Sequence, residues 1–387
     1  MISANYKKWN NLLGWLVFVI SSAVYIITSE PTASFWDCGE YIATSYKLQV
    51  GHPPGAPFFQ LIGRFFSMFA FGDVTLVARM INTMSALASG FTILFLFWTI
   101  TLLIKKIVLK YGELNNNSII AIFGSALVGS LAYTFSDSFW FSAVEGEVYA
   151  SSSFYTAVTF WAILKWDEQA DEKHSFRWLL LISYLVGLSI GVHLLNLLAI
   201  PALVLVYYFR KFKPSTKGVI ISLIFSFILL GLILYGIIPE IVKISGFFER
   251  FFTNTFGLPF GFGSFVYFIL LFGLIIYGII YSIKKQKIIL NTIVLALTFL
   301  IIGYSSFFIL VIRSNANTPI DENNPDNATA LVSYLEREQY GSNPLFYGQY
   351  FNAPVVGYED GDPVYTKAYL VMSGDRRYAT FYSRYSA

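Results

Sequence analysis

The chain carries apolar stretches long enough to cross a lipid bilayer, and these constrain its fold more than any other feature. A membrane-spanning helix needs roughly 20 predominantly apolar residues. Composition agrees, with 56% hydrophobic against 13% charged residues and a mean hydropathy of +0.61. We therefore predict an all-α polytopic membrane protein of about nine transmembrane helices. The nine stretches are Leu12 to Thr28, Leu76 to Ile104, Ser118 to Phe135, Val148 to Leu164, Trp178 to Ile190, Leu194 to Phe209, Gly218 to Ile238, Phe265 to Ile283 and Ile288 to Ile312.

The placement of Lys and Arg predicts the orientation, because cytoplasmic segments carry an excess of both. With the N-terminus inside, the outer segments between spans hold only Lys47, Arg64, Arg79, Lys243 and Arg250. The inner segments hold fifteen: Lys7, Lys8, Lys105, Lys106, Lys110, Lys165, Lys173, Arg177, Arg210, Lys211, Lys213, Lys217, Lys284, Lys285 and Lys287.

Two segments allow an alternative interpretation. Trp178 to Phe209 could be one long helix, but a single crossing would turn the later basic clusters outward, so two spans joined by a tight outer turn fit better. The first stretch follows Lys7 and Lys8 and could be a signal peptide, but no clear cleavage site follows it. We expect an uncleaved anchor.

Cysteine and histidine content restricts the chemistry. One cysteine, Cys38, excludes a disulfide framework, and three histidines make a histidine-rich metal site improbable. We therefore expect carboxylates to carry the chemistry, with no metal and no cofactor.

The first outer loop is the densest constellation of polar residues. Asp37 and Glu40 are three residues apart, so a helix would bring both carboxylates to one face, where either could act as a general base. Solvated acids beside a juxtamembrane helix are the alternative. His52 precedes two prolines that fix the backbone, and Phe58 to Phe71 is amphipathic enough to lie in the membrane interface. His52 and Arg64 could there face a lipid phosphate, although headgroup anchoring explains Arg64 equally well.

Two further outer segments carry candidate residues. Glu145 and Glu147 have no basic residue in their own loop, so repulsion between them should raise at least one pKa. His193 falls at the tight turn between two short spans, where it is either a hydrogen-bonded turn residue or the wall of a site.

Four sequence blocks resemble the GT-C superfamily of membrane glycosyltransferases, in the branch of the protein O-mannosyltransferases and a subfamily long described as a domain of unknown function. The blocks are Ser34 to Glu40, Val50 to Pro57, Ala143 to Tyr149 and Gly191 to Asn196. The match is imperfect, because O-mannosyltransferases usually have adjacent acidic residues in the first loop, whereas Cys38 and Gly39 separate Asp37 from Glu40.

The resemblance implies inverting transfer of a sugar, mannose in the O-mannosyltransferase branch, from a polyprenyl-phosphate donor to Ser or Thr hydroxyls of exported proteins. It implies Asp37 or Glu40 as catalytic residue, and His52, Arg64, Glu145, Glu147 and His193 as substrate-binding residues. The implied location is a bacterial inner membrane with a periplasmic active site, and a nucleic-acid partner is not expected. The alternatives are a transporter of lipid-linked sugars or a non-catalytic component of a glycosylation or export complex.

The composition changes after Ile312, where Asn, Asp, Pro and Gly become frequent. We predict a transmembrane domain over residues 1–312 and the start of an outer soluble domain over 313–387, with a helix over Ala328 to Tyr340 and strands beyond Pro344. Because related proteins continue well past this length, we expect the chain to be truncated.

Overall fold

The computed structural model describes residues 5–341 and, beyond them, 346–348, 350, 352–354, 356–370 and 375–386. Contacts divide the chain into two compact units. The first unit comprises residues 1–51, 56–230 and 286–307, and the second comprises 52–55, 231–285 and 308–387.

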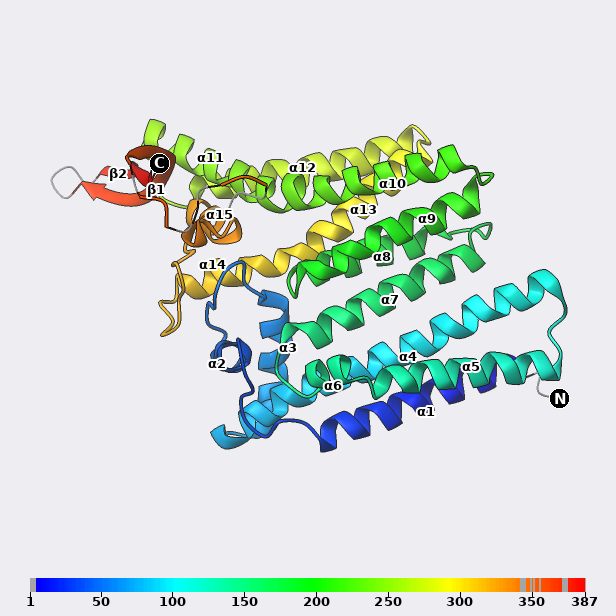
Figure 1. Cartoon of the computed structure of the whole chain (residues 1–387). Helices are drawn as coiled ribbons and strands as arrows, with labels where there is room; N and C mark the ends of the chain where they lie inside the picture. Colours follow the sequence, from blue (N-terminus) through cyan, green and yellow to red (C-terminus); the bar gives the residue numbers. More distant parts are fainter. Residues whose placement is uncertain are drawn as a thin grey trace. The chain divides into compact units, whose positions relative to one another are not determined.

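The first unit is a helical bundle (Figure 1). Its core is apolar, with Val17, Ile93, Phe97, Ile119 and Ile122 among the fully buried side chains. Its helices are α1 (Tyr6–Ile27), α2 (Cys38–Lys47), α3 (Pro57–Ser67), α4 (Val77–Tyr111), α5 (Asn116–Thr134), α6 (Asp137–Ala143), α7 (Val148–Glu168), α8 (Phe176–Ile190), α9 (Ile200–Lys211), α10 (Thr216–Gly231) and α13 (Ile288–Tyr304). Short 3-10 helices lie at Met68–Ala70, Val74–Leu76, Leu194–Ala199 and Ser305–Phe307.

The second unit combines helices with a two-stranded sheet. Its elements are a π-helical turn (Leu232–Ile237), α11 (Ile238–Phe256), α12 (Phe262–Lys284), α14 (Phe308–Ser314), α15 (Ala328–Leu335), a 3-10 turn (Glu338–Tyr340), β1 (Tyr358–Leu370) and β2 (Asp375–Ser386). The strands pair antiparallel, with Tyr365 opposite Thr380 and Lys367 opposite Tyr378. The predicted helix and strands of the C-terminal segment are thus confirmed in the described residues, whereas the division into domains 1–312 and 313–387 stays a prediction.

The predicted membrane helices correspond to observed ones. Each of the nine predicted stretches lies on a helix. In the described part of the chain, seven helical segments are long and apolar enough to span a membrane. Helices α7 and α8 are not among these seven. Apolar side chains such as Phe265, Leu274 and Tyr277 of α12 are more than half exposed, as expected of a lipid-facing surface. The protein is a multi-pass, predominantly helical membrane protein.

The segment from Trp178 to Phe209 forms two helices. Helix α8 ends at Ile190, and α9 begins ten residues later, after a turn at Gly191 to His193 and a 3-10 helix. The tight turn predicted from the basic clusters is therefore present.

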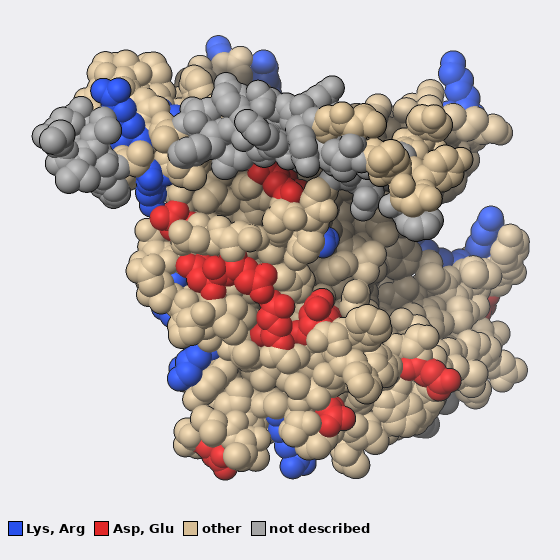
Figure 2. Space-filling model, turned by 60° about the vertical axis from the view of Figure 1, so that its left-hand side comes forward, with Lys and Arg blue, Asp and Glu red and all other residues tan. Residues whose placement is uncertain are grey.

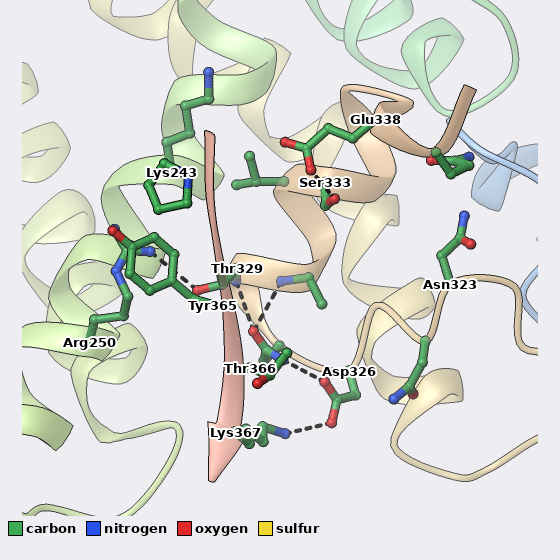
Figure 3. A pocket seen from close by; sticks show the side chains of 16 residues that line it. Lys243, Arg250, Asn323, Asp326, Thr329, Ser333, Glu338, Tyr365, Thr366 and Lys367 are labelled. Atoms are coloured by element: carbon green, nitrogen blue, oxygen red, sulfur yellow. Dashed lines mark hydrogen bonds and ion pairs between the residues drawn. The ribbon is translucent and has the colours of Figure 1, made fainter. Parts of the chain in front are cut away.

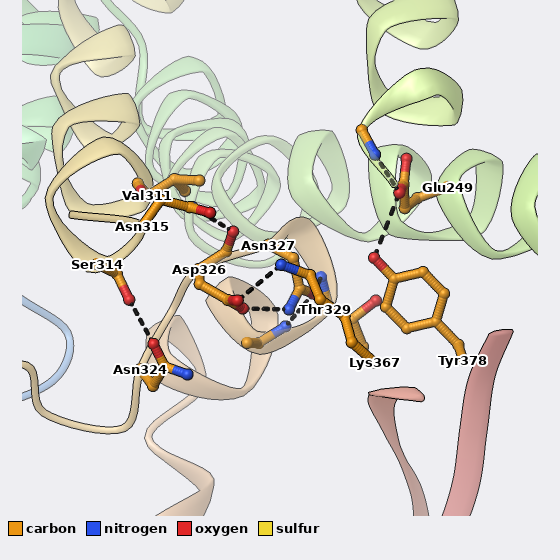
Figure 4. Close-up of polar contacts among 12 residues, drawn as sticks. Glu249, Val311, Ser314, Asn315, Asn324, Asp326, Asn327, Thr329, Lys367 and Tyr378 are labelled. Carbon is orange, nitrogen blue, oxygen red and sulfur yellow. Dashed lines mark hydrogen bonds and ion pairs between the residues drawn. The ribbon is translucent and has the colours of Figure 1, made fainter. Parts of the chain in front are cut away.

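The Asn- and Asp-rich segment after α14 is held by hydrogen bonds (Figure 4). Ser314 Oγ donates to Asn324 Oδ1 at 2.8 Å, and Asn315 Nδ2 donates to the Asp326 carbonyl at 2.6 Å. Asn327 caps α15 by accepting from the amides of Thr329 and Ala330. This segment therefore orders the side chains around α15.

Candidate functional site

Helix α2 begins immediately after Asp37. Asp37 is exposed at the N-cap position, and Glu40 is half-buried in the first turn. A methyl group at Gly51 would collide with Glu40 Oε1, so the absence of a side chain at position 51 makes room for this carboxylate. Both predicted catalytic carboxylates therefore belong to one helical turn.

The loop of Glu145 and Glu147 packs against the first loop. The Glu30 amide donates to the Val144 carbonyl at 3.0 Å, and Asn82 Nδ2 donates to the carbonyls of Glu30 and Thr32 at 2.6 and 2.9 Å. Two acidic segments more than a hundred residues apart in sequence are thus fixed side by side.

The two glutamates differ in their surroundings. Glu147 caps α7, its Oε2 accepting from the Val148 amide at 2.8 Å. Glu145 is 4% exposed, and its Oε2 has no hydrogen-bond partner among the described residues. Burial raises the pKa of Glu145, and a hydrogen bond with the Ser34 side chain opposes that shift. The predicted rise in a pKa is confirmed, but desolvation causes it rather than repulsion between the glutamates.

Tyr41 shows that these carboxylates share one electrostatic environment. It is 8% exposed, and its ring packs edge-on against Phe59. Burial raises its pKa, and the negative charges of Glu147, Asp37 and Glu40 raise it further. The Cys38 thiol has a raised pKa for the same principal reason, with Glu145 and Glu147 adding to it. Carboxylates from α2 and from the second loop therefore surround one end of α2.

His193 is connected to this cluster through a ring contact with Tyr149. The two rings lie 5.4 Å apart between centroids, and Tyr149 interacts electrostatically with Glu147 and Asp37. His193 Nδ1 accepts from the Leu195 amide at 3.2 Å, and burial lowers the pKa of the imidazole. The neutral ring then carries its proton on Nε2, which makes that atom a hydrogen-bond donor. His193 is both a turn residue and a neighbour of the cluster.

Arg64 lies apart from this cluster. Arg64 Nη1 donates to the Tyr46 carbonyl at 2.7 Å, near the C-terminal end of α2. Since α2 has ten residues and rises about 1.5 Å per residue, that end lies about 13 Å along the axis from Asp37. His52 belongs to the second unit, where its carbonyl accepts from Tyr334 Oη at 3.2 Å.

Sequence analysis did not identify Asn82 or the position of Tyr149. An Asn within the predicted span Leu76 to Ile104 is a signal that could have revealed the first, because an amide in an apolar helix needs partners. The pairing of Tyr149 with His193 depends on the packing of α7 and has no sequence signature.

One face of the molecule displays the acidic side chains prominently. Figure 2 turns forward the left-hand ends of the helices in Figure 1, and acidic groups gather near the middle of that face. Apolar membrane-spanning helices and carboxylates grouped at one end of α2 define a polytopic membrane protein with a candidate acidic site.

Comparison with known proteins places this chain near the O-mannosyltransferases. Residues 37–216 match the family described as the N-terminal domain of protein O-mannosyl-transferase TMEM260. This match contains Asp37, Glu40, Glu145, Glu147 and His193. The predicted resemblance to protein O-mannosyltransferases is confirmed.

Two curated relatives carry the same name. Protein O-mannosyl-transferase tmem260 of Dictyostelium discoideum is 27% identical over 143 residues, which are 37% of this chain and 16% of the relative. Protein O-mannosyl-transferase TMEM260 of Mus musculus is 24% identical over 260 residues, which are 62% of this chain and 34% of the relative. The matches thus cover about a third or less of each relative's length. No solved structure matches the chain significantly.

Proposed function

We propose that this chain is a membrane glycosyltransferase of the GT-C type that transfers mannose from a polyprenyl-phosphate donor to Ser or Thr hydroxyls of proteins. The observation that carries the proposal is the grouping of Asp37, Glu40 and Glu147 around Tyr41 at one end of α2. The names of the two relatives supply the sugar and the class of acceptor.

In the proposed reaction a carboxylate accepts the proton of the acceptor hydroxyl as its oxygen attacks the anomeric carbon. The bond from that carbon to the lipid phosphate breaks, the phosphate leaves, and the configuration inverts. Asp37 is our choice as the base, because it is exposed and can reach an acceptor arriving from solution, whereas Glu40 is half-buried beside Gly51. Glu40 then orients the acceptor or the sugar.

His193 and Glu147 are proposed to bind the donor sugar. The Nε2–H group of a neutral His193 donates to a sugar or phosphate oxygen, and Glu147 accepts from a sugar hydroxyl. Glu145 is as buried as Glu147, but burial raises its pKa and its Oε2 has no hydrogen-bond partner among the described residues, so its proposed role is to hold the second loop. Arg64 ties α3 to the far end of α2 and is assigned a positioning role, while His52 is kept as a candidate for contacting the donor phosphate.

The proposed location of the site is the non-cytoplasmic side of the membrane, which follows from the distribution of Lys and Arg. The bacterial inner membrane stays a prediction, since the two relatives named above are eukaryotic.

The test is transfer of radiolabelled mannose from polyprenyl-phosphate mannose to protein in membranes containing the chain. We expect Asp37→Asn to lower transfer by about 10²-fold or more, within the usual contribution of a general base, and Glu40→Gln to lower it less. Asp73→Asn is the matched control, because Asp73 is an exposed acid that caps a 3-10 helix outside the site. Full transfer by Asp37→Asn and Glu40→Gln at equal expression would reject the carboxylate mechanism.

A further inference from the structure

The second unit contains a polar pocket of about 850 Å³ that the proposed chemistry does not use. It lies between α11, α15 and β1, and charged, amide and hydroxyl side chains line it (Figure 3). Its size falls in the range of roughly 300–1,000 Å³ that is typical of ligand sites. Space of this kind among polar side chains suits a ligand with several hydrogen-bonding groups.

Two of the three cations on its wall are paired with acids. Lys243 Nζ lies 2.5 Å from Glu336 Oε1. Lys367 Nζ lies 2.6 Å from Asp326 Oδ2 (Figure 3). Arg250 has no acidic partner among the described residues. The pocket therefore offers one uncompensated guanidinium.

That guanidinium is held in position before any ligand arrives. Arg250 Nη1 donates to Thr329 Oγ1 at 3.3 Å, and the guanidinium carbon lies 4.0 Å from the centre of the Tyr365 ring. A Cβ at Gly246 would lie 3.3 Å from Thr329 Oγ1, so this glycine permits the close approach of α15 to α11. The guanidinium is held at one nitrogen by a hydrogen bond and at one face by an aromatic ring. Its other N–H groups remain available for two parallel hydrogen bonds to a planar anion.

The charge balance favours a carboxylate over a phosphate as that anion. A phosphate monoester carries about −1.5 to −2 charges at neutral pH and usually requires more than one cation. Here a single unpaired cation matches the single charge of a carboxylate, and Glu338 on the opposite part of the wall opposes additional negative charge. The amides of Asn323 and Gln339 and the hydroxyl of Thr366 offer donors and acceptors that suit peptide groups.

We propose that this pocket binds an acidic polypeptide segment, with Arg250 pairing with an Asp or Glu side chain of that segment. The inference rests on the proposed function in one respect, namely that the bound segment belongs to the acceptor protein. The pocket then supplies an acceptor preference that the carboxylates of the first unit do not determine.

The test measures binding of fluorescent Ser- and Thr-containing peptides to the purified full chain in lipid nanodiscs, without donor. Two peptides of equal length differ at one position, Asp in one and Asn in the other. We expect the Asp peptide to bind about tenfold more tightly or better, as a charge-assisted hydrogen-bonded pair allows. Arg250→Gln should abolish that preference, and Arg250→Lys should retain part of it.

A second pair of variants tests the charge balance without altering Arg250. Asp326→Asn releases Lys367 and should strengthen binding of the Asp peptide several-fold. The matched control is the double variant Asp326→Asn with Lys367→Gln, which leaves the net charge unchanged and should preserve the wild-type preference. These variants keep the inference testable if Arg250→Gln does not fold.

Three results would overturn the inference: equal binding of both peptides to the wild type, an unchanged preference in Arg250→Gln, or displacement of the Asp peptide by inorganic phosphate more effectively than by unlabelled peptide. The last would identify a phosphate site instead. Since no donor is present, loss of the peptide preference with intact mannose transfer would reject this inference alone. Retained preference without transfer in the wild type would reject the proposed function alone.

Discussion

At the scale of single residues, Glu145 is the group whose environment conflicts most with its charge. Its carboxyl is buried, and one oxygen has no partner among the described residues. Because burial raises its pKa in the folded protein above the ordinary 4.5, the folded state binds this proton more tightly than the unfolded state does. Its contribution to stability is therefore most favourable below the unfolded pKa and is lost as pH rises through the folded pKa.

We predict that Glu145→Gln raises the thermal unfolding midpoint at pH 7. The amide removes the buried charge and keeps an acceptor for Ser34. The difference from the wild type should shrink as the pH falls toward about 4, where the wild-type carboxyl is protonated. Thermal unfolding of the detergent-solubilised chain at several pH values measures this.

Glu147→Gln is the matched control, since it changes the same chemical group two residues away. Glu147 caps α7 through the Val148 amide, so loss of its negative charge at this helix N-terminus should lower the midpoint at pH 7. A lower midpoint for Glu145→Gln as well would contradict the assignment of Glu145 as a buried, poorly compensated charge.

Gly51 offers a second prediction at this scale. A side chain at position 51 would displace the Glu40 carboxylate. Gly51→Ala should therefore lower mannose transfer toward the level of Glu40→Gln while the protein remains folded. Transfer is compared with size-exclusion elution of the same preparation, and Gly124→Ala serves for comparison, because no atom among the described residues lies within 4 Å of a Cβ there. Wild-type transfer by Gly51→Ala would show that Glu40 tolerates the displacement.

The candidate site could be predicted at the level of residues but not of their roles. The three-residue spacing placed Asp37 and Glu40 on one face if the segment were helical, and in the structure Glu40 lies in the first turn of α2 with Asp37 at its N-cap. Sequence spacing could not show that Glu145 and Glu147 are both buried or that Glu147 caps a helix, because the second loop packs against the first loop through the hydrogen bond from the Glu30 amide to the Val144 carbonyl. The sequence also could not predict the hydrogen bond from Arg64 to the Tyr46 carbonyl, because this bond depends on how α3 packs on α2.

At the scale of elements, close approach of α8 and α13 depends on two glycines. A Cβ at Gly303 would lie 2.5 Å from the Leu188 nitrogen and 2.6 Å from the Gly187 carbonyl carbon, and both neighbours are backbone. Such backbone contacts cannot be relieved by a side-chain rotation. Small residues at this crossing therefore provide the helix contact that lipid-embedded helices obtain from tight packing.

We predict that Gly303→Ala destabilises the protein, by about 1–3 kcal/mol if the helices separate as overpacked cores do. Gly273→Ala on α12 is the matched control, because no atom among the described residues lies within 4 Å of a Cβ there. In a helix with open space, the same substitution should stabilise by up to about 1 kcal/mol. Thermal midpoints of both variants measure the contrast, and equal midpoints would exclude a role for the crossing.

At the scale of the whole molecule, the number of crossings depends on α7 and α8. Nine spans follow from the distribution of Lys and Arg, whereas the criterion of length and apolarity selects seven helical segments that omit these two helices. Ion pairs favour nine. Near the C-terminal end of α7, Glu168 pairs with Lys105 of α4 at 3.5 Å, and Asp167 pairs with Arg210 of α9 at 3.8 Å. Serine, threonine and tyrosine side chains along α7 lower its hydropathy, and α8 has only 15 residues, so the criterion of length and apolarity selects neither helix.

We therefore predict that the loop between α7 and α8 faces the cytoplasm. The side of the membrane on which this loop lies distinguishes nine crossings from seven. If α7 and α8 do not cross the membrane, this loop lies on the outer side, and every other loop stays on the side that nine crossings give it. A cysteine at Glu172, which is exposed in this loop, should react with a membrane-impermeant maleimide only after the membrane is opened. The native Cys38 gives little background, because it is buried and burial raises its thiol pKa. Ser138→Cys and Gln286→Cys are the outer and inner controls, since nine and seven spans place each of them on the same side. Labelling of Glu172→Cys in sealed cells, with Ser138→Cys labelled and Gln286→Cys protected, would instead establish seven crossings and place α7 and α8 on the outer side.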